Sequence, residues 1–271
     1  MSEQEFAVLN KSEEVIVLDM ATLCGDPPEV NGSAIDMYYE TAESLIKRTL
    51  DAQVADDTIL LRLFLLELIS AAEYYFRSIL AALPSVCRAS GSLIEKSMMM
   101  LGAVSYYGPT QLAFGVFEHA SLSGKGEVVK YTRDLAGFNI HKESSVGVAL
   151  AEFERVCQLR HAIVHAQGRL WYKNICELGL PQSKPRCVCL TALGFQGCVA
   201  RTHNAVRAYN AFVGNRVIGT WASSKLLTGK WSDDRALVEA FHGLFYSKKD
   251  GSGEADPRSL HARLCKQLKL A

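Results

Sequence analysis

The segment from Thr58 to Leu83 constrains the fold most, because it is apolar on nearly every side of a helix and is followed by Pro84. A helix without a polar face is normally buried at the centre of a helical domain, and proline stops a helix. Its most apolar part, Thr58 to Ser70, carries Arg62 and Glu67 and is shorter than the roughly 20 residues that cross a bilayer. We therefore expect a soluble domain built around this helix, with no membrane span.

Apolar residues at helical spacing predict helices over most of the remaining chain. The expected helices cover 33–54, 92–106, 109–122, 127–138, 144–167, a long stretch that begins near 191, 233–246 and a short amphipathic end. Strands are expected only at 14–18 and 187–190, the second within a loop of roughly 20 residues. The predicted fold class is therefore all-α, divided into an N-terminal extension (1–32), a helical domain (33–220) and a C-terminal helical appendage (221–271).

The net charge of zero hides an asymmetry between the two halves of the chain. Residues 1–150 contain 11 Lys/Arg and 20 Asp/Glu, whereas residues 151–271 contain 18 and 9. A basic surface attracts polyanions such as nucleic acid. The alternative is that the basic half docks on the acidic half of the same chain or of a second copy. If the acidic half masks the basic one, deletion of residues 1–30 should increase RNA affinity.

The cysteines and the start of the chain indicate a cytoplasmic protein without a metal or cofactor. Eight cysteines are scattered without a disulfide-like spacing, which is typical of reduced thiols. The first ten residues lack the basic and apolar regions of a secretory signal. Zinc is disfavoured because four cysteines (Cys176, Cys187, Cys189 and Cys198) form no C-x2-C pair. The chain also has no phosphate-binding P-loop, no dinucleotide-binding glycine motif and no nucleophile elbow.

The predicted helix over 144–167 carries an arginine within its apolar stripe. Apolar residues recur at 146, 150, 153 and 157, and the next step of three lands on Arg160. A guanidinium at such a position needs an anion or a hydrogen-bond partner. His161 and His165 follow, and imidazole is the side chain best suited to move protons near neutral pH.

The hexapeptide from Arg160 to His165 resembles the Arg-x4-His motif of the HEPN superfamily of all-α domains. The resemblance covers about residues 33–220 and includes an apolar central helix upstream, several short helices, a glycine after the motif and a last long helix. Many family members have a polar residue, often asparagine, directly after the arginine, where this chain has His161.

The resemblance implies a metal-independent endoribonuclease, frequently a toxin or anti-phage defence effector, that cleaves RNA in a cleft lined by both copies of a homodimer. Arg160 and His165 would be catalytic and His161 accessory, giving 2′,3′-cyclic phosphate and 5′-hydroxyl ends on single-stranded or loop RNA. Five residues rotate a helix by about 140°, so Arg160 and His165 of one copy point apart and a site shared by two copies is expected. An antitoxin or regulatory protein is a possible partner. Control by adenylation of a tyrosine two residues after the motif is not supported, because that position is Gln167.

Further charged residues are candidates for supporting this site, and each has a structural alternative. Glu67, Glu73 and Arg77 either line the cleft or are ordinary charges on the helix surface. The residues expected to contact RNA are Arg155, Arg169, Lys173, Arg201 and Arg207. The rival function is a non-catalytic nucleotide-binding or protein-interaction module of the same fold. Burial of His165 against its own core would exclude the nuclease.

Overall fold

The computed structural model describes residues 19–26, 32–251 and 256–270. The chain divides into two compact units, Met1–Asn31 and Gly32–Ala271. In the first unit the described residues form one 3-10 turn, η1 (Met20–Leu23), capped by the Asp19 carboxylate. The strand expected at 14–18 lies outside the described residues.

The second unit is made of helices and one small two-stranded sheet, so the predicted all-α class is confirmed. Its elements, in chain order, are α1 (Ala34–Arg48), α2 (Ala52–Ala55), α3 (Thr58–Ala82), η2 (Leu83–Ser85), α4 (Arg88–Ile94), α5 (Leu101–Gln111), η3 (Leu112–Phe117), α6 (Lys125–Ala136), α7 (Ser145–Ala166), β1 (Arg169–Leu170), α8 (Tyr172–Glu177), β2 (Arg186–Cys187), α9 (Ala192–Ser224), α10 (Trp231–Phe245) and α11 (Pro257–Leu268).

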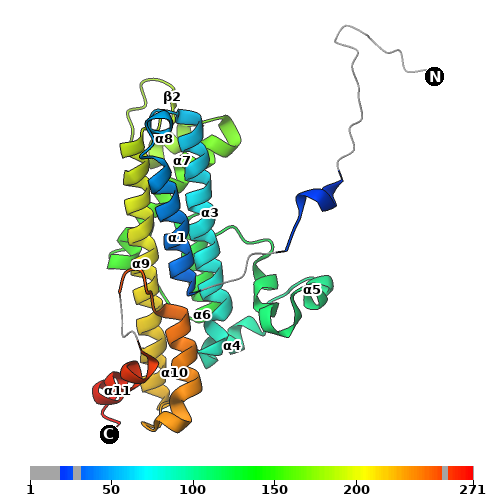
Figure 1. The fold of residues 1–271 in the computed structure, drawn as a ribbon, viewed down its shortest axis with the longest axis vertical. Coiled ribbons are helices and arrows are strands. Elements are labelled where there is room, and N and C mark those ends of the chain that lie inside the picture. Colours follow the sequence, from blue (N-terminus) through cyan, green and yellow to red (C-terminus); the bar gives the residue numbers. More distant parts are fainter. Residues whose placement is uncertain (1–18, 27–31, 252–255, 271) are drawn as a thin grey trace, which may run out of the picture. The chain divides into compact units, whose positions relative to one another are not determined.

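Helix α3 packs in a bundle with α1, α7 and α9 and contacts all three (Figure 1). It begins where the sequence predicts, because the Asp57 carboxylate accepts hydrogen bonds from the backbone amides of Ile59 and Leu60. Tyr75 and Phe76 are fully buried in this core. The helix is not buried on every side, however: Ile59 is 71% exposed and Leu63 54%. An apolar strip of the central helix therefore faces solvent.

The expected helix over 92–106 is wrong, because the chain forms two helices with a break between Glu95 and Met100. Met98 is 95% exposed and Met100 58%. Short helices depend on packing for their stability, and this stretch packs little apolar surface that could hold a continuous helix together. A second change of direction occurs at Gly108, whose φ of 61° is left-handed.

The long helix α9 passes through the boundary expected at residue 220 and joins the C-terminal helices to the bundle. Trp221 is 1% exposed, and its indole nitrogen donates to the carbonyl of Val86 at 2.8 Å. Helix α10 contacts α9 and α1, and α11 contacts α10. The buried Asp234 and His261 side chains hold these two helices together, with 2.8 Å between Oδ2 and Nε2. Residues Gly32–Ala271 therefore form one compact unit.

Candidate functional site

Helix α7 carries the Arg160 to His165 motif, and specific residues determine where it begins and ends. The Ser144 hydroxyl caps its first turn by accepting a hydrogen bond from the Gly147 amide at 3.2 Å. Its last turn ends at Gln167, whose φ is 51°, and Gly168 follows with φ of 87°. The helix therefore ends in two consecutive residues with left-handed backbone conformation. The motif residues occupy the last two turns of the helix.

Arg160 lies against α3, opposite Glu73. The nearest atoms, Arg160 Nη2 and Glu73 Oε1, are 3.9 Å apart, and the two side chains are 31% and 15% exposed. The other carboxylate oxygen of Glu73 lies 3.9 Å from Arg77 Nη2. Glu73 Oε1 is buried, and no described group donates a hydrogen bond to it. Glu73 thus lies between two guanidinium groups, and the structure places Glu73 and Arg77, two of the three charged residues considered as supports, beside Arg160.

A pocket of about 330 Å³ lies beside Arg160 between α3 and α7. Its other lining residues are Leu63, Leu66, Glu67, Ser70, Glu73 and Val164. Leu63 and Val164 are 54% and 48% exposed, so part of its rim is apolar and open to solvent. Arg160 thus lines a groove that has an apolar rim. A second polypeptide could cover this rim.

His161 and His165 are both exposed, on a neighbouring face of α7. Their ring centroids are 4.5 Å apart with planes at 48°, and His161 also meets the Trp171 ring edge-on at 5.9 Å. Val164, not His165, lies in the groove with Arg160. Arg160 and His165 of one chain therefore face different directions, as the helical rotation predicts.

The surroundings of His161 lower the pKa of its imidazole and favour the neutral form. Partial desolvation lowers the pKa of His161 below its ordinary value, electrostatic interactions with His165, Arg160 and Lys173 lower it further, and Glu177 acts in the opposite direction. A neutral imidazole can accept a proton. His161 is thus in a suitable state to act as a base.

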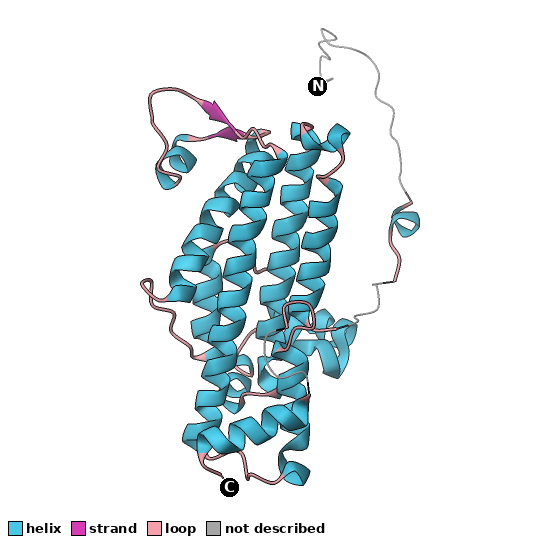
Figure 2. Ribbon diagram, turned by 60° about the vertical axis from the view of Figure 1, so that its left-hand side comes forward, coloured by secondary structure: helices cyan, strands magenta, loops and turns pink. Residues whose placement is uncertain are grey.

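The segment after α7 holds Trp171 and Lys173 next to the histidines. Strands β1 and β2 pair antiparallel, with Arg169 opposite Cys187 (Figure 2). The expected loop over 170–190 therefore contains a helix and half of a two-stranded sheet, and its strand lies at 186–187 instead of 187–190.

Arg62 of α3 fastens this segment to the end of α7. Its guanidinium donates to the carbonyls of Gln167 and Val188 and to the Cys187 sulfur. Sequence reasoning missed this role, although Arg62 stands out as a charge within the most apolar stretch. It also missed Trp171, for which the sequence carries no comparable signal.

The five residues expected to contact RNA have different surroundings in the structure. Arg155 donates to the Leu178 carbonyl at 3.1 Å, and Arg201 pairs with Glu152 at 3.1 Å. Arg169 and Lys173 are exposed near the motif, Lys173 within 3.8 Å of Glu177, while Arg207 pairs with Asp250 at 3.7 Å in a different pocket. Arg169 and Lys173 are therefore the best placed of the five beside the histidines.

Within residues 19–26, 32–251 and 256–270, no three His, Cys, Asp or Glu side chains are grouped so that they could hold a metal ion. The cysteines Cys176, Cys187 and Cys189 are exposed, and Cys198 is buried. None of the described helices combines the length and apolar character needed to cross a bilayer. Comparison with protein-family models, curated proteins and solved structures finds no match for the chain.

Proposed function

We propose that this chain is a metal-independent endoribonuclease of HEPN type that acts as a toxin or defence effector. The observation that carries the proposal is the exposed pair His161 and His165, 4.5 Å apart, on the same two helical turns as Arg160 at its groove. Two imidazoles and a guanidinium are the groups that phosphodiester transfer needs: a base, an acid and a cation for the developing charge.

The chemistry would be an attack by the ribose 2′-oxygen on the adjacent phosphorus. One imidazole, acting as base, takes the 2′-hydroxyl proton as the 2′-oxygen bonds to phosphorus. The bond from phosphorus to the 5′-oxygen breaks, and a second imidazole, in its protonated form, donates a proton to that oxygen. His165 fills one of these two roles as base or acid. Arg160 stabilises the negative charge on the phosphoryl oxygens. The products carry a 2′,3′-cyclic phosphate and a 5′-hydroxyl. A flexible single strand or loop suits this reaction, because its backbone can bring the three atoms into line.

A homodimer would bring Arg160 of one copy toward His165 of the other. The two side chains of a single chain face different directions, and the rim of the groove exposes Leu63 and Val164. Ile59, one turn before Leu63 on α3, is 71% exposed and extends this apolar strip. Association through the strip would bury apolar surface and close the groove over Arg160.

One observation supports the non-catalytic alternative. Glu73 lies 3.9 Å from Arg160 and forms an ion pair with it. If this pair persists when the chain meets a nucleic acid, Arg160 serves the fold and the groove becomes an interaction surface. The nuclease requires phosphate to compete with Glu73 for the guanidinium, which the 31% exposure of Arg160 permits.

The test is incubation of the purified full chain with total RNA in EDTA, with analysis of the product ends. Wild type should cleave and leave cyclic phosphates, and Arg160→Ala and His165→Ala should each reduce the rate by about 10²-fold or more. Matched controls are Arg235→Ala and His141→Ala, which remove exposed side chains of the same types elsewhere. The proposal is overturned if all proteins cleave equally, or if wild type neither cleaves RNA nor is more toxic to expressing cells than the variants.

A further inference from the structure

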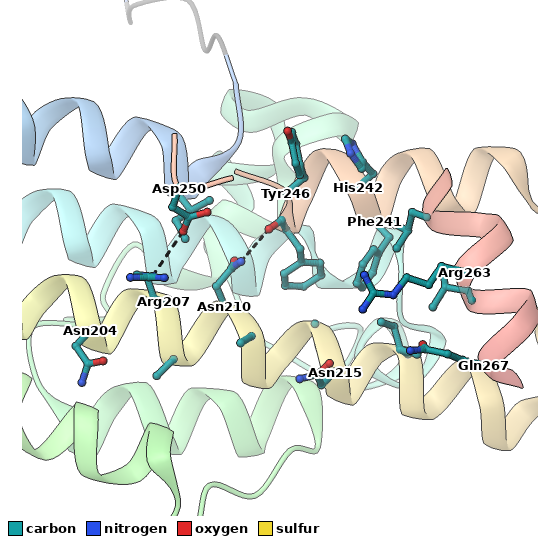
Figure 3. Close-up of a pocket in the computed structure, with 18 residues that line it drawn as sticks. Asn204, Arg207, Asn210, Asn215, Phe241, His242, Tyr246, Asp250, Arg263 and Gln267 are labelled. Carbon is teal, nitrogen blue, oxygen red and sulfur yellow. Dashed lines mark hydrogen bonds and ion pairs between the residues drawn. The ribbon is translucent and has the colours of Figure 1, made fainter. Parts of the chain in front are cut away.

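The longest stretch of the chain without a charged residue is 97–117, which lies between Lys96 and Glu118. It comprises the segment 97–100 followed by α5 and η3. Other surfaces of the molecule carry charges: in the pocket of about 680 Å³ between α9, α10 and α11, for example, Arg207 pairs with Asp250 at 3.7 Å (Figure 3). Residues 97–117 can offer a partner only apolar contacts and uncharged hydrogen-bonding groups.

The 3-10 helix η3 anchors this stretch to the bundle. It contacts α3, and the buried ring of Phe117 has its centroid 5.8 Å from that of Tyr131 on α6. Helix α5 in turn packs on η3, because Ala103 is buried and a Cβ atom added to Gly115 would lie only 3.3 Å from the Tyr107 ring. One side of α5 is therefore fixed by its contact with η3, and Figure 1 shows α5 beside the bundle.

The rest of α5 and the segment before it expose large apolar side chains. Met98, Leu101 and Tyr106 are each at least 82% exposed, and Met100 and Val104 are exposed as well. Single exposed apolar residues are ordinary on a protein surface, whereas a contiguous group of them marks an interaction site. These five side chains lie within residues 98–106 and form such a group.

The directions of these side chains favour a lipid bilayer over a protein surface as the partner. Five residues rotate a helix by about 140°, so Leu101 and Tyr106 point to different sides of α5. A flat protein surface covers one side of a helix, whereas lipid chains surround whatever enters them. The lack of charge agrees with this choice, because charged side chains are costly in the hydrocarbon region of a bilayer.

We propose that residues 97–117 dock the protein on a lipid bilayer, with Met98 and the exposed part of α5 entering the boundary between head groups and acyl chains. Burial of apolar side chains at this boundary supplies the affinity. Tyr106 suits the boundary, because its phenol combines an apolar ring with a polar hydroxyl. The inference is independent of RNA cleavage, since it uses none of the residues assigned to that reaction.

The test is flotation of the full chain with phosphatidylcholine vesicles. Wild type should float with the vesicles, and high salt should not release it, because the contact involves no charge. Leu101→Asp and Tyr106→Asp should each lower the partition coefficient about tenfold or more, because each loses apolar burial. The matched control is Leu193→Asp, which alters a leucine of α9 that is 78% exposed and should bind like wild type.

Tryptophan fluorescence gives a second measurement of the same contact. The emission of Leu101→Trp should shift to shorter wavelength when vesicles are added, because the new indole enters a less polar environment. Leu193→Trp should show no such shift, and the native tryptophans contribute equally to both variants. Thermal unfolding verifies that each variant is folded.

The proposal is overturned if wild type does not float with the vesicles, a result that would indicate a protein partner for this surface. It is also overturned if high salt releases the chain, or if Leu193→Asp weakens binding as much as Leu101→Asp. An effect of only one of Leu101→Asp and Tyr106→Asp would show a one-sided contact and contradict insertion. Failure here would leave RNA cleavage untouched, and loss of cleavage in Arg160→Ala would leave vesicle binding unchanged.

Discussion

Replacing Gly168 by alanine should destabilise the end of α7 more than an ordinary loop substitution does. Gly168 has a φ of 87°, and a Cβ there would lie 2.8 Å from Arg62 Cζ. The left-handed backbone costs about 1–2 kcal/mol for a residue with a side chain. Displacing the guanidinium weakens a hydrogen bond of a charged group, which is worth about 1.5–3 kcal/mol. The sum, about 2.5–5 kcal/mol, corresponds to a fall in Tm of roughly 5–20 °C for a chain of this size.

The assay is urea and thermal unfolding of Gly168→Ala beside Gly179→Ala. Gly179 also has a left-handed φ, of 67°, but no atom lies within 4 Å of the Cβ position. It should therefore lose only the backbone contribution. In an Arg62→Ala background, Gly168→Ala should cost about as little as Gly179→Ala, because the clash is gone. Equal costs for the two glycines in the wild-type background, or an unchanged cost for Gly168→Ala without Arg62, would refute the reasoning.

Three further predictions concern the groove, the histidines and the C-terminal helices. Leu63→Asp should convert the proposed dimer to a monomer in sedimentation velocity, because it places a charge on the apolar rim. Lys173→Gln should raise the pKa of His161 in an NMR titration, because Lys173 is one of the charges that lower it. Burial raises the pKa of Asp234, but hydrogen bonds, above all from Thr228, bring it below its ordinary value. The stabilisation is therefore present above the unfolded-state pKa of about 3.9 and lost as pH falls through the lower folded-state value, so Asp234→Asn should lower the Tm at neutral pH more than in acid.

Control variants and contrary outcomes distinguish a local effect from a general one in each of these three measurements. Leu101→Asp alters a residue that is 87% exposed and lies outside the groove, and a monomer in this variant too would show that the rim is not the interface. Lys184→Gln should leave the pKa of His161 unchanged, and an equal rise in both lysine variants would exclude a local effect of Lys173. A Tm difference between wild type and Asp234→Asn that is the same at every pH would contradict the role given to the ionised carboxylate.

The long helices could be predicted because each buries one stripe at helical spacing over many turns. In α9 the residues Phe195, Val199 and Val206, which recur at helical spacing, are all buried. The helix expected over 92–106 followed the same rule and was wrong, because Met98 and Met100 find almost no core to pack against. Periodicity reports which residues can be buried together, and not whether a partner surface is present.

The candidate site was only partly predictable, because its contacts join distant parts of the chain. The sequence identifies Arg160 as an interruption of an apolar stripe, and its partner Glu73 as a charge on the central helix. Arg62 also stands out in the sequence, as a charge within an apolar stretch. Its hydrogen-bond acceptors, however, are the carbonyls of Gln167 and Val188, which lie more than 100 residues away and cannot be predicted from residue spacing. Arg207 likewise lies in a different pocket from Arg160, and this depends on how the helices pack and not on the spacing of residues in the sequence.

The most direct test of the central claim is to mix the Arg160→Ala and His165→Ala proteins under conditions in which subunits exchange. Each variant alone should be inactive on RNA in EDTA. A mixed dimer offers one intact Arg160 and one intact His165 from different copies, so the mixture should recover part of the wild-type cleavage rate, with cyclic-phosphate ends. If subunits exchange and the mixture stays as inactive as its components while wild type cleaves, the two residues do not cooperate across a dimer and the shared site is contradicted.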